Sequence, residues 1–417
     1  MNRYQDIVGR IQYGLFLTVV ALLPFPQIAL RYVCVTWFVF WLLEGRWMRK
    51  PNVRRTIYDL RFTIPFLLFG LWFVWKAVSG LWAADSAVWA RQIERYLTFA
   101  VLVPVGIWGL NERYDWKLAG KVLAWSCVAA VPVYLGLMTV LFYHRDWTAL
   151  LPLSVDWDNT IPDWMTFVAD NISHIKHRLY LSSVALLGAV MAVQVWRERR
   201  WLLAWTLPVM LSIIPLTGSR QAIITGVVML VIGIIYALPQ RYRLRYGLCM
   251  LALGALLSGA VLKFHPRTEY VNMEAVKQMR EVSYYHDIRL NIWGFGLQQP
   301  SDYLLYGLGA GQCTDYLRER YREAGFDYYY ERGYNAHCQY LEELIELGVA
   351  GLLLFLLAWC TVPLCTNKKG RPTAVLFTTL FMLNMCTECM FGRYDGVALW
   401  TMGMLLILLQ SHAEGEQ

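Results

Sequence analysis

The feature that most constrains this sequence is the repetition of apolar runs that are each long enough to cross a lipid bilayer. Hydrophobic residues make up 57% of the 417 positions, and only 16% are charged. Soluble domains contain about 25% charged residues, and a helix needs about twenty apolar residues to span the hydrocarbon core. We therefore predict an all-α, polytopic membrane helix bundle and exclude soluble fold classes.

Hydropathy and helical periodicity predict about twelve transmembrane helices. Their expected ranges are 11–25, 28–43, 62–80, 96–110, 119–143, 179–195, 201–217, 222–238, 246–263, 338–362, 373–390 and 394–410. The first run lacks a small-residue cleavage site after it, so we expect a retained helix. No internal repeat is evident, so an inverted-repeat transporter has no direct support.

Basic residues in short loops predict the orientation of the bundle. Arginines and lysines gather in segments 46–61, 197–200, 241–245 and 368–371. With twelve helices, all four loops and both termini fall on one side, which the positive-inside rule makes cytoplasmic. These loops hold many of the basic residues behind the net charge of +8, and none of them matches a nucleic-acid-binding motif.

A polar insertion from Phe264 to Asn335 interrupts the apolar pattern and ends just before His337. The expected organisation is a bundle of nine helices over 1–263, a large outer loop over 264–337 and a final bundle of three helices over 338–417. Helical spacing within the insertion predicts helices that lie across the outer mouth of the bundle. We expect the chemistry at this outer face.

Three residues are candidates for that chemistry. Arg220 follows a Gly-Ser pair between two apolar runs, where a guanidinium is costly unless it meets water, a partner or an anion. Arginine also grips phosphate with two parallel hydrogen bonds. Arg289 has His286 about one helical turn before it. His337 carries an imidazole, which can accept a proton from a hydroxyl and suits a general base. The alternatives are a snorkelling arginine, a solvated basic face and an interfacial histidine.

The sequence leaves more than one role open for several charged residues near these candidates. Glu342 and Glu346 are four apart, so they either orient a neighbouring cation or solvate the start of a helix. Glu388, Arg393 and Asp395 surround the last outer turn, and we expect them to pair with each other or with the bundle interior.

The remaining motifs predict neither a metal site nor a cofactor. Cys386 and Cys389 form a lone CxxC without the second pair that a zinc site needs. Pairing between Cys313 and Cys338 is left open. The glycine-rich segment 307–312 is neither a Rossmann nor a Walker loop, and it favours a sharp backbone turn near the site.

Three stretches together resemble the O-antigen ligase and O-antigen polymerase superfamily of bacterial inner-membrane glycosyltransferases. They are TGSRQA at Arg220, the Arg289 segment with its following G.GAG pattern, and AHCQYLEELIELGVAGLLLF from Ala336. Their order and spacing carry the resemblance, which is concentrated in residues 205–362. Ala336 and Cys338 depart from the proline and asparagine that are common in the family.

The resemblance implies a GT-C-like, metal-independent, inverting transfer of glycan from undecaprenyl diphosphate, without a cofactor. Arg220 and Arg289 would bind the diphosphate, and His337 would deprotonate an acceptor sugar hydroxyl. His286, Gly309 and Gly311 join the expected substrate-binding residues. The expected location is the bacterial inner membrane, where the protein would be surrounded by membrane lipids. The site would face the periplasm.

Among the relatives, the sequence favours a ligase that transfers a finished glycan to a lipid A-core sugar. The alternatives are an O-antigen or exopolysaccharide polymerase and a protein O-glycosylating ligase, which share the motifs. A lipid-linked oligosaccharide transporter is a further alternative. A transporter predicts charges along the inner bundle at mid-membrane depth, where Lys76 and Lys121 are the exceptions to an outer distribution. Sugar, linkage and oligomeric state stay open.

Overall fold

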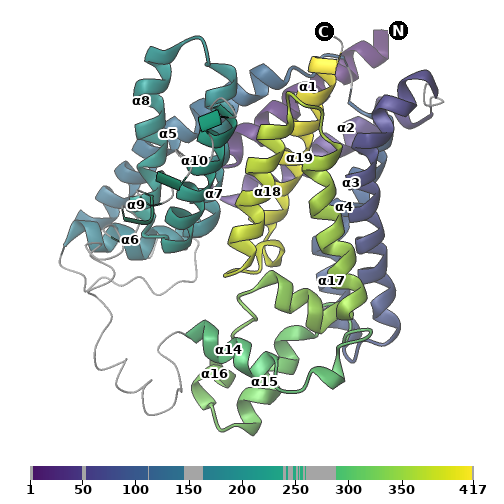
Figure 1. Cartoon of the computed structure of the whole chain (residues 1–417), viewed down its shortest axis with the longest axis vertical. Helices are drawn as coiled ribbons and strands as arrows, with labels where there is room; N and C mark the ends of the chain where they lie inside the picture. Colours follow the sequence, from purple (N-terminus) through teal and green to yellow (C-terminus); the bar gives the residue numbers. More distant parts are fainter. Residues whose placement is uncertain are drawn as a thin grey trace.

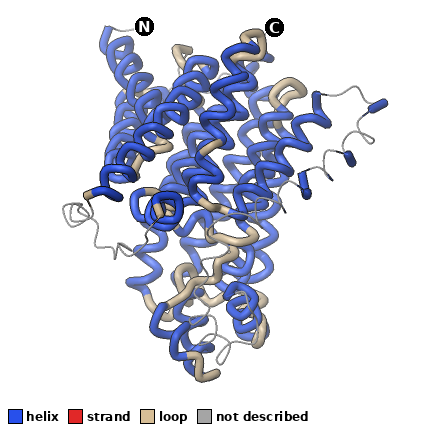
Figure 2. Tube along the Cα trace, turned by 90° about the vertical axis from the view of Figure 1, so that its left-hand side faces the viewer, coloured by secondary structure: helices blue, strands red, loops and turns tan. Residues whose placement is uncertain are grey.

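The structure is a computed structural model, and it describes residues 3–48, 53–110, 112–144, 163–237 and 288–415, with 241–242, 248–249, 252, 254–256 and 259. Every regular element in these ranges is a helix, as Figure 2 shows. The predicted all-α class is therefore confirmed. The expected span at 246–263 and the first part of the insertion lie mostly outside the described residues.

The bundle is made from helices on both sides of the insertion. Its helices are α1 (Arg3–Leu22), α2 (Gln27–Leu43), α3 (Val53–Val78), α4 (Ser86–Trp108), α5 (Trp116–Tyr143), α6 (Trp164–Ile175), α7 (Arg178–Val195), α8 (Arg200–Leu211), α9 (Ile213–Thr217), α10 (Arg220–Ala237), α17 (Gln339–Cys365), α18 (Arg371–Met385) and α19 (Tyr394–Gly415). Both termini lie at one end of the bundle (Figure 1).

Seven helical segments in the described ranges are long and apolar enough to cross a membrane. They are Thr63–Leu81, Trp116–Tyr143, Arg178–Val195, Arg200–Thr217, Arg220–Ala237, Gln339–Cys365 and Tyr394–Ser411. Each overlaps a predicted span. The prediction of about twelve spans stays a prediction, since length and composition single out only these seven among the described residues.

The last three helices pack into the N-terminal bundle and complete it. α17 packs along α3, while α18 packs against α10 and α17. The buried centre is aromatic: the ring centroids of Phe99 and Trp400 are 4.2 Å apart, and those of Phe69 and Trp400 are 4.7 Å apart. Tilted and edge-to-face pairs of this kind add to the stabilisation from burial. The bundle is therefore one unit, although the insertion divides it in sequence.

Aspartates fix where several of these helices begin. Asp85 accepts hydrogen bonds from the amides of Ala87 and Val88 at the start of α4. Asp115 caps α5 in the same way, and Asp163 caps α6. A capping carboxylate satisfies amides that have no partner within the helix. The helix α6 was not predicted, because its sequence lies within a segment expected to be a loop.

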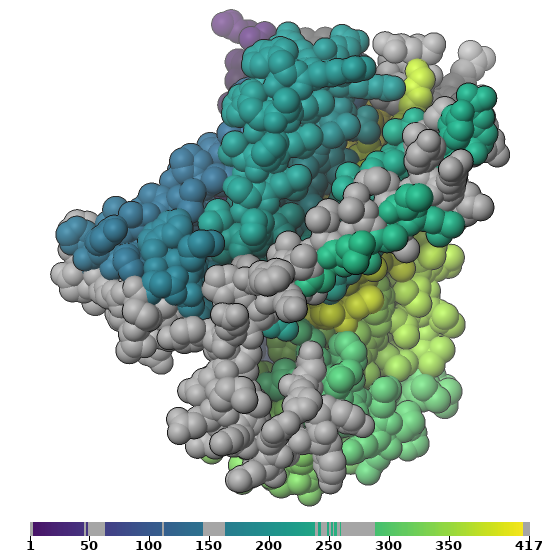
Figure 3. Space-filling view, turned by 60° about the vertical axis from the view of Figure 1, so that its left-hand side comes forward, coloured from purple at the N-terminus to yellow at the C-terminus, as the bar shows by residue number. Residues whose placement is uncertain are grey.

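The described part of the insertion, residues 288–337, forms a lobe at the end of the bundle away from the termini (Figure 1). It contains α14 (Ile288–Gly296), the 3₁₀ turn η4 (Pro300–Asp302), α15 (Cys313–Glu323) and α16 (Asp327–Arg332). Buried lobe residues such as Ile292 and Leu317 share one apolar cluster with Leu341 and Ile345 of α17. The lobe therefore shares its core with the bundle, and it borders the C-terminal helices on the surface as well (Figure 3).

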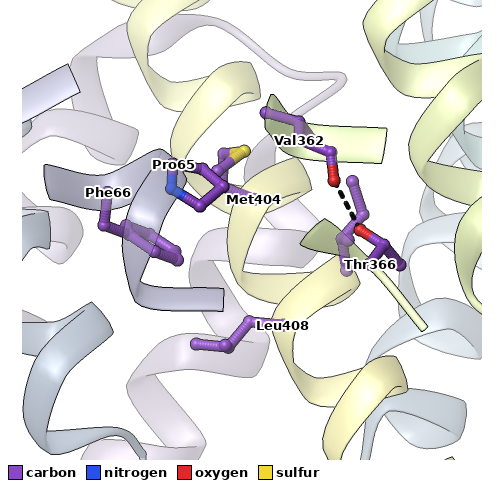
Figure 4. A pocket seen from close by; sticks show the side chains of 7 residues that line it. Pro65, Phe66, Val362, Thr366, Met404 and Leu408 are labelled. Carbon is purple, nitrogen blue, oxygen red and sulfur yellow. Dashed lines mark hydrogen bonds between the residues drawn. The ribbon is translucent and has the colours of Figure 1, made fainter. Parts of the chain in front are cut away.

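A small apolar cleft lies at the far end of α17 from the lobe. Pro65 and Phe66 of α3, Val362 and Thr366 at the end of α17, and Met404 of α19 contribute to its lining (Figure 4). The Thr366 hydroxyl donates to the Val362 carbonyl at 2.6 Å. This cleft holds no charged side chain and lies far along α17 from His337.

Candidate functional site

His337 lies at the junction between the lobe and α17 in an unusual backbone conformation. Its φ is 44°, and it is the one described residue other than glycine with a positive φ. The Asn335 side chain accepts the His337 amide at 3.1 Å, and the Trp293 indole donates to the Ala336 carbonyl at 3.1 Å. Backbone strain of this kind costs about 1–3 kcal/mol and gathers at functional sites. The surroundings therefore hold the imidazole in place at an energetic cost.

The side chain of His337 faces Glu388, which follows α18. Nδ1 lies 3.7 Å from Glu388 Oε2, an ion-pair distance, and the Glu388 side chain is only 10% exposed. Burial opposes the charged form of Glu388, but contacts with His337, His177 and Arg393 outweigh it and lower the pKa of this carboxyl. We expected Glu388 to pair with Arg393 or Asp395 or with the bundle interior. In the structure it lies at ion-pair distance from His337, the candidate base.

Arg289 reaches the same segment from α14 of the lobe. Its Nε donates to the carbonyl of Thr387 at 3.2 Å, one residue before Glu388. Asn291 on the same helix is buried and donates to the Tyr329 hydroxyl at 3.0 Å, which anchors α14 within the lobe. Arg289 and His337 therefore meet at one short stretch of chain, residues 387–388.

Arg220 begins α10 and approaches the segment from the bundle side. Gly218 takes a left-handed conformation just before it, with φ of 59°. The neighbouring Gln221 donates to the Leu383 carbonyl at 2.7 Å, and Thr225 donates to Asn384 Oδ1 at 2.8 Å. The Arg220 side chain is exposed and makes no ion pair or hydrogen bond with any described residue. Its guanidinium is therefore available to a ligand.

These contacts arrange the three sequence candidates around residues 383–388. His337 and Arg289 contact the end of this segment, and the helix start that carries Arg220 is bound to its beginning. His286 lies outside the described residues. The site is thus built from the lobe, α10 and the turn after α18.

Part of the chain is similar to a known family. The family model described as O-antigen ligase matches residues 205–356. This segment of the chain is therefore similar to the O-antigen ligase family. No curated protein matches the sequence significantly. The matched range includes Arg220, Arg289 and His337, whereas Glu388 and His177 lie outside it.

Within the matched range, the glycine-rich loop packs against protein on two sides. Gly309 and Gly311 have φ values of 100° and 85°, and an added Cβ would lie 2.7 Å from Ala83 Cβ and 2.9 Å from a Val88 methyl. The amides of Leu308 and Gly309 donate to the carbonyls of Ile345 and Glu346 in α17. These contacts give the two glycines a packing role, and their predicted contact with substrate stays a prediction.

The same hydrogen bonds explain a bend in α17. Gly348 interrupts the helix with φ of 68° and ψ of −172°. Carbonyls that lose their helical partners at a bend must be satisfied elsewhere, and the loop amides satisfy two of them. In return, the Val349 amide donates to the Leu304 carbonyl at 2.8 Å. The lobe is therefore bound tightly to the first turns of α17.

The acidic face of α17 is buried against α3. The ammonium of Lys76 lies 3.0 Å from a Glu343 oxygen and 2.8 Å from a Glu346 oxygen, with all three side chains at most 1% exposed. Gln339 donates to Glu342 and Glu343, both at 2.9 Å. The alternative of a neighbouring cation is confirmed for Glu346, whereas Glu342 accepts from Gln339. Both glutamates are buried, so the alternative in which they solvate a helix start is wrong.

Sequence reasoning missed the two residues that flank the candidate base. The sequence predicts only that Glu388 pairs with nearby charges or the bundle interior, and it indicates no role for His177. His177 precedes α7 and is largely buried, which lowers its pKa. Both residues are titratable and lie at the ends of apolar helices, and this pattern could have indicated a functional role. Asp395, also noted in sequence, pairs instead with Lys176 at 2.6 Å.

Two further sequence questions receive direct answers. Cys313 and Cys338 are both free, so they do not pair in this structure. Lys121 is exposed on α5, and Lys76 is held by carboxylates. Within the described ranges, no group of three histidine, cysteine or acidic side chains could hold a metal ion.

Proposed function

We propose that this protein is a ligase that transfers a glycan from undecaprenyl diphosphate to a sugar hydroxyl of lipid A-core at the periplasmic face of the bacterial inner membrane. The observation that carries this proposal is the approach of Arg289 and His337 to residues 387–388 in a chain similar to the O-antigen ligase family over residues 205–356. The helical membrane bundle and the family match support a membrane-bound glycosyltransferase.

The arginines would supply electrostatic stabilisation of the leaving group. Transfer from a polyprenyl diphosphate releases a diphosphate anion, and charge developing on that anion must be stabilised. Arg220 is exposed and unpaired among the described side chains, and a guanidinium matches phosphate geometry with two parallel donors. Arg289 is partly buried beside the turn after α18. Two fixed cations suit this role without a metal ion.

His337 would act as the general base in this mechanism. The acceptor hydroxyl oxygen attacks the anomeric carbon from the face opposite the diphosphate, and its proton passes to the imidazole. The carbon–oxygen bond to the diphosphate breaks at the same time, so the anomeric configuration inverts. The side chain is 27% exposed, which leaves part of the ring accessible to an acceptor.

The second candidate function is the related polymerase, which would use another lipid-linked repeat as acceptor. The family match supports ligase and polymerase alike, and the proposal of a ligase rests on the single dominant outer lobe next to His337. A protein O-glycosylating ligase would use the same groups. A transporter is less well supported, because the buried Lys76 is held in ion pairs between α3 and α17.

The decisive experiment uses the purified chain in nanodiscs with an undecaprenyl-diphosphate-linked glycan. Separate reactions contain lipid A-core and a second lipid-linked repeat as acceptor. The ligase proposal expects transfer to lipid A-core only, whereas chain extension of the lipid-linked repeat would identify a polymerase. His337→Ala should abolish transfer and keep the wild-type melting temperature. Normal transfer by that variant would remove His337 as the base.

A further inference from the structure

Two tyrosine rings and an arginine of the lobe lie beside the candidate base. Tyr334 lies three residues before His337, and the centroids of the two rings are 6.1 Å apart. The Tyr328 ring is next, with its centroid 6.2 Å from that of Tyr334. The Arg332 guanidinium lies 5.5 Å from the centre of the Tyr328 ring. Tyr328 and Arg332 are exposed and Tyr334 is partly exposed, so all three are accessible beside the imidazole.

The hydroxyl groups of Tyr328 and Tyr334 have no close partner within the described part of the chain. They lie 3.5 Å from each other, whereas a hydroxyl hydrogen bond is usually about 2.7–2.8 Å long. Other lobe tyrosines are bonded more closely. The Tyr303 hydroxyl donates to a carbonyl of α14 at 2.6 Å, and the Tyr329 hydroxyl accepts from Asn291 at 3.0 Å. The first two hydroxyls therefore keep their bonding capacity for a ligand.

Arg332 also differs from the arginines of α15. Arg320 pairs with Glu323, and Arg318 donates to the carbonyl of Tyr330 at 3.3 Å. Arg332 makes no hydrogen bond or ion pair with a residue that the structure describes, and it contacts only a tyrosine ring. A guanidinium with its donors unused can hold a phosphate or a carboxylate through two parallel hydrogen bonds.

The segment between α16 and His337 fixes the rings relative to each other. Gly333 ends α16 with φ of 58°, and its amide donates to carbonyls of that helix. The Tyr321 hydroxyl donates to the Tyr334 carbonyl at 3.4 Å. The Ala336 carbonyl and the His337 amide are bonded as well. The Tyr334 ring is therefore held beside the imidazole before a substrate arrives.

This position suits the acceptor sugar. A general base lies within about 3 Å of the atom whose proton it takes, so the sugar that carries the attacking hydroxyl must touch His337. A pyranose is wider than that distance, and the rest of the acceptor therefore extends over the residues around the imidazole. The C–H bonds of a pyranose carry a small positive charge and pack on the negative face of an aromatic ring. Tyrosine hydroxyls can both donate to and accept from sugar hydroxyls.

We propose that Tyr328 and Tyr334 form an aromatic platform that binds the acceptor sugars, and that Arg332 binds an anionic substituent of those sugars, a phosphate or a carboxylate. The proposal rests on the proposed function, because it names the part of the site that receives the acceptor. The donor diphosphate stays with Arg220 and Arg289. No bond forms or breaks on the platform, so its contribution is to bind the acceptor and align the attacking hydroxyl.

The test measures acceptor binding separately from transfer. Lipid-free core oligosaccharide is titrated calorimetrically into the full-length protein in nanodiscs, and transfer is measured at varied lipid A-core concentration. Tyr328→Leu and Tyr334→Leu should each raise the Kd for the oligosaccharide and the acceptor KM about 2- to 10-fold. The kcat and the donor KM should change little, because the lost contacts bind ground state and transition state alike. Tyr334→Phe, which keeps the ring, should lose less affinity than Tyr334→Leu.

Arg332→Gln tests the anionic substituent. Added salt should weaken oligosaccharide binding to the wild type more than to Arg332→Gln, because salt screens an ion pair. Dephosphorylated oligosaccharide then identifies the group. If the wild type and Arg332→Gln bind it equally, the substituent is a phosphate, and a persistent difference indicates a carboxylate. Equal salt dependence of the two proteins with the untreated oligosaccharide would refute the role of Arg332.

The matched control is the pair of Tyr316 and Arg320 on α15. The Arg320 guanidinium also lies 5.5 Å from the centre of a tyrosine ring. This pair packs beside the 3₁₀ turn η4, where the Tyr316 hydroxyl donates to the Gln299 carbonyl at 3.4 Å. Tyr316→Leu and Arg320→Gln should keep the wild-type Kd and acceptor KM. A rise in Tyr316→Leu equal to that in Tyr328→Leu would overturn the proposal, and so would a rise in the donor KM alone.

Failure of the platform is distinguishable from failure of the proposed function. Unchanged acceptor affinity in Tyr328→Leu and Tyr334→Leu, together with wild-type transfer to lipid A-core, would refute the platform alone. A wild-type protein without transfer to lipid A-core would refute the proposed ligase. Normal transfer by His337→Ala would refute the base, and the titration would still test the platform. The melting temperature of each variant separates lost affinity from misfolding, and Tyr328 is 38% exposed, so its replacement leaves the core intact.

Discussion

Lys76 Nζ lies 3.0 Å from Glu343 Oε1, across a contact between helices whose residues are 267 positions apart in sequence. The Trp72 indole donates to the same carboxylate at 2.9 Å, and the Tyr96 ring lies 4.8 Å from the ammonium. This buried cluster fixes the first turns of α17, and therefore the position of His337, against α3.

Loss of the Lys76 charge should destabilise the protein. Lys76→Met leaves Glu343 and Glu346 buried without their cation, and breaking such a pair costs about 3–5 kcal/mol. Thermal unfolding in detergent measures the effect. Lys121→Met, at an exposed position on α5, is the control. Adding Glu343→Gln to Lys76→Met should recover part of the loss, and equal melting temperatures for the two lysine variants would contradict the prediction.

Replacement of Arg220 should reduce transfer without a loss of stability. Its side chain is exposed and makes no hydrogen bond or ion pair with a described residue, so we expect the fold not to depend on it. Arg220→Ala should lower kcat about 100-fold or more, as loss of one transition-state donor does. Arg220→Lys keeps the charge but loses the paired donors, and we expect an intermediate rate. Arg200→Ala, exposed at the start of α8, is the control. A melting temperature that falls in parallel with activity would indicate a structural role instead.

The protein should lose stability as the pH falls below about 6.5. Burial lowers the pKa of His177 in the folded state, so below its unfolded pKa the unfolded chain binds more protons and becomes favoured. Glu388, whose folded pKa is also lowered, extends the loss below about pH 4.3. Melting temperatures measured between about pH 7.5 and pH 3.5 test both parts of this prediction.

His177→Gln isolates the histidine contribution to this pH dependence. Its melting temperature should fall less between pH 6.5 and 5.5 than that of the wild type. His144→Gln, which replaces an exposed histidine after α5, should keep the wild-type slope. A wild-type slope in His177→Gln would show that another group causes the loss.

The bend in α17 should not accept a side chain. At Gly348 an added Cβ would lie 2.4 Å from the Leu305 carbonyl oxygen, and its φ is 68°. Gly348→Ala should therefore cost about 1–3 kcal/mol from backbone strain alone. At Gly136 in α5 nothing lies within 4 Å of an added Cβ, so Gly136→Ala should be neutral or stabilising by about 0.5–1 kcal/mol. A tolerated Gly348→Ala would mean that the helix can straighten.

Transfer should survive treatment with EDTA. The proposed mechanism assigns charge stabilisation to Arg220 and Arg289. It uses no divalent metal ion that EDTA could remove. The assay is glycan transfer before and after EDTA, with the chelator then removed. Activity that is lost with EDTA and restored by a divalent ion would contradict the metal-independent mechanism.

The sequence predicts the helical class and the positions of most spans, because both follow from local hydropathy. It also singles out Arg220, Arg289 and His337, because a polar residue beside an apolar run can be recognised from the sequence alone. Helices were expected within the insertion, and α14 and α15 are two of them. The short helix α16 and the apolar helix α6 were not predicted, because neither has the length of a span.

The partners of these residues could not be predicted, because each lies on a distant part of the chain. Glu388 is 51 positions from His337, and Lys76 is more than 260 positions from its glutamates. A carboxylate in a turn looks solvated in sequence until the packing shows that it is buried. The glycine-rich loop was expected near a ligand, and only the backbone contacts with α17 show how it packs.

The reciprocal hydrogen bonds between the glycine-rich loop and the bend of α17 also have a mechanical meaning. The lobe and the helix start that follows His337 are fastened on both sides of Gly348, so neither can tilt without carrying the other. Because His337 lies between the lobe and α17, a displacement of the lobe relative to the bundle would also move the residue that we propose as the base.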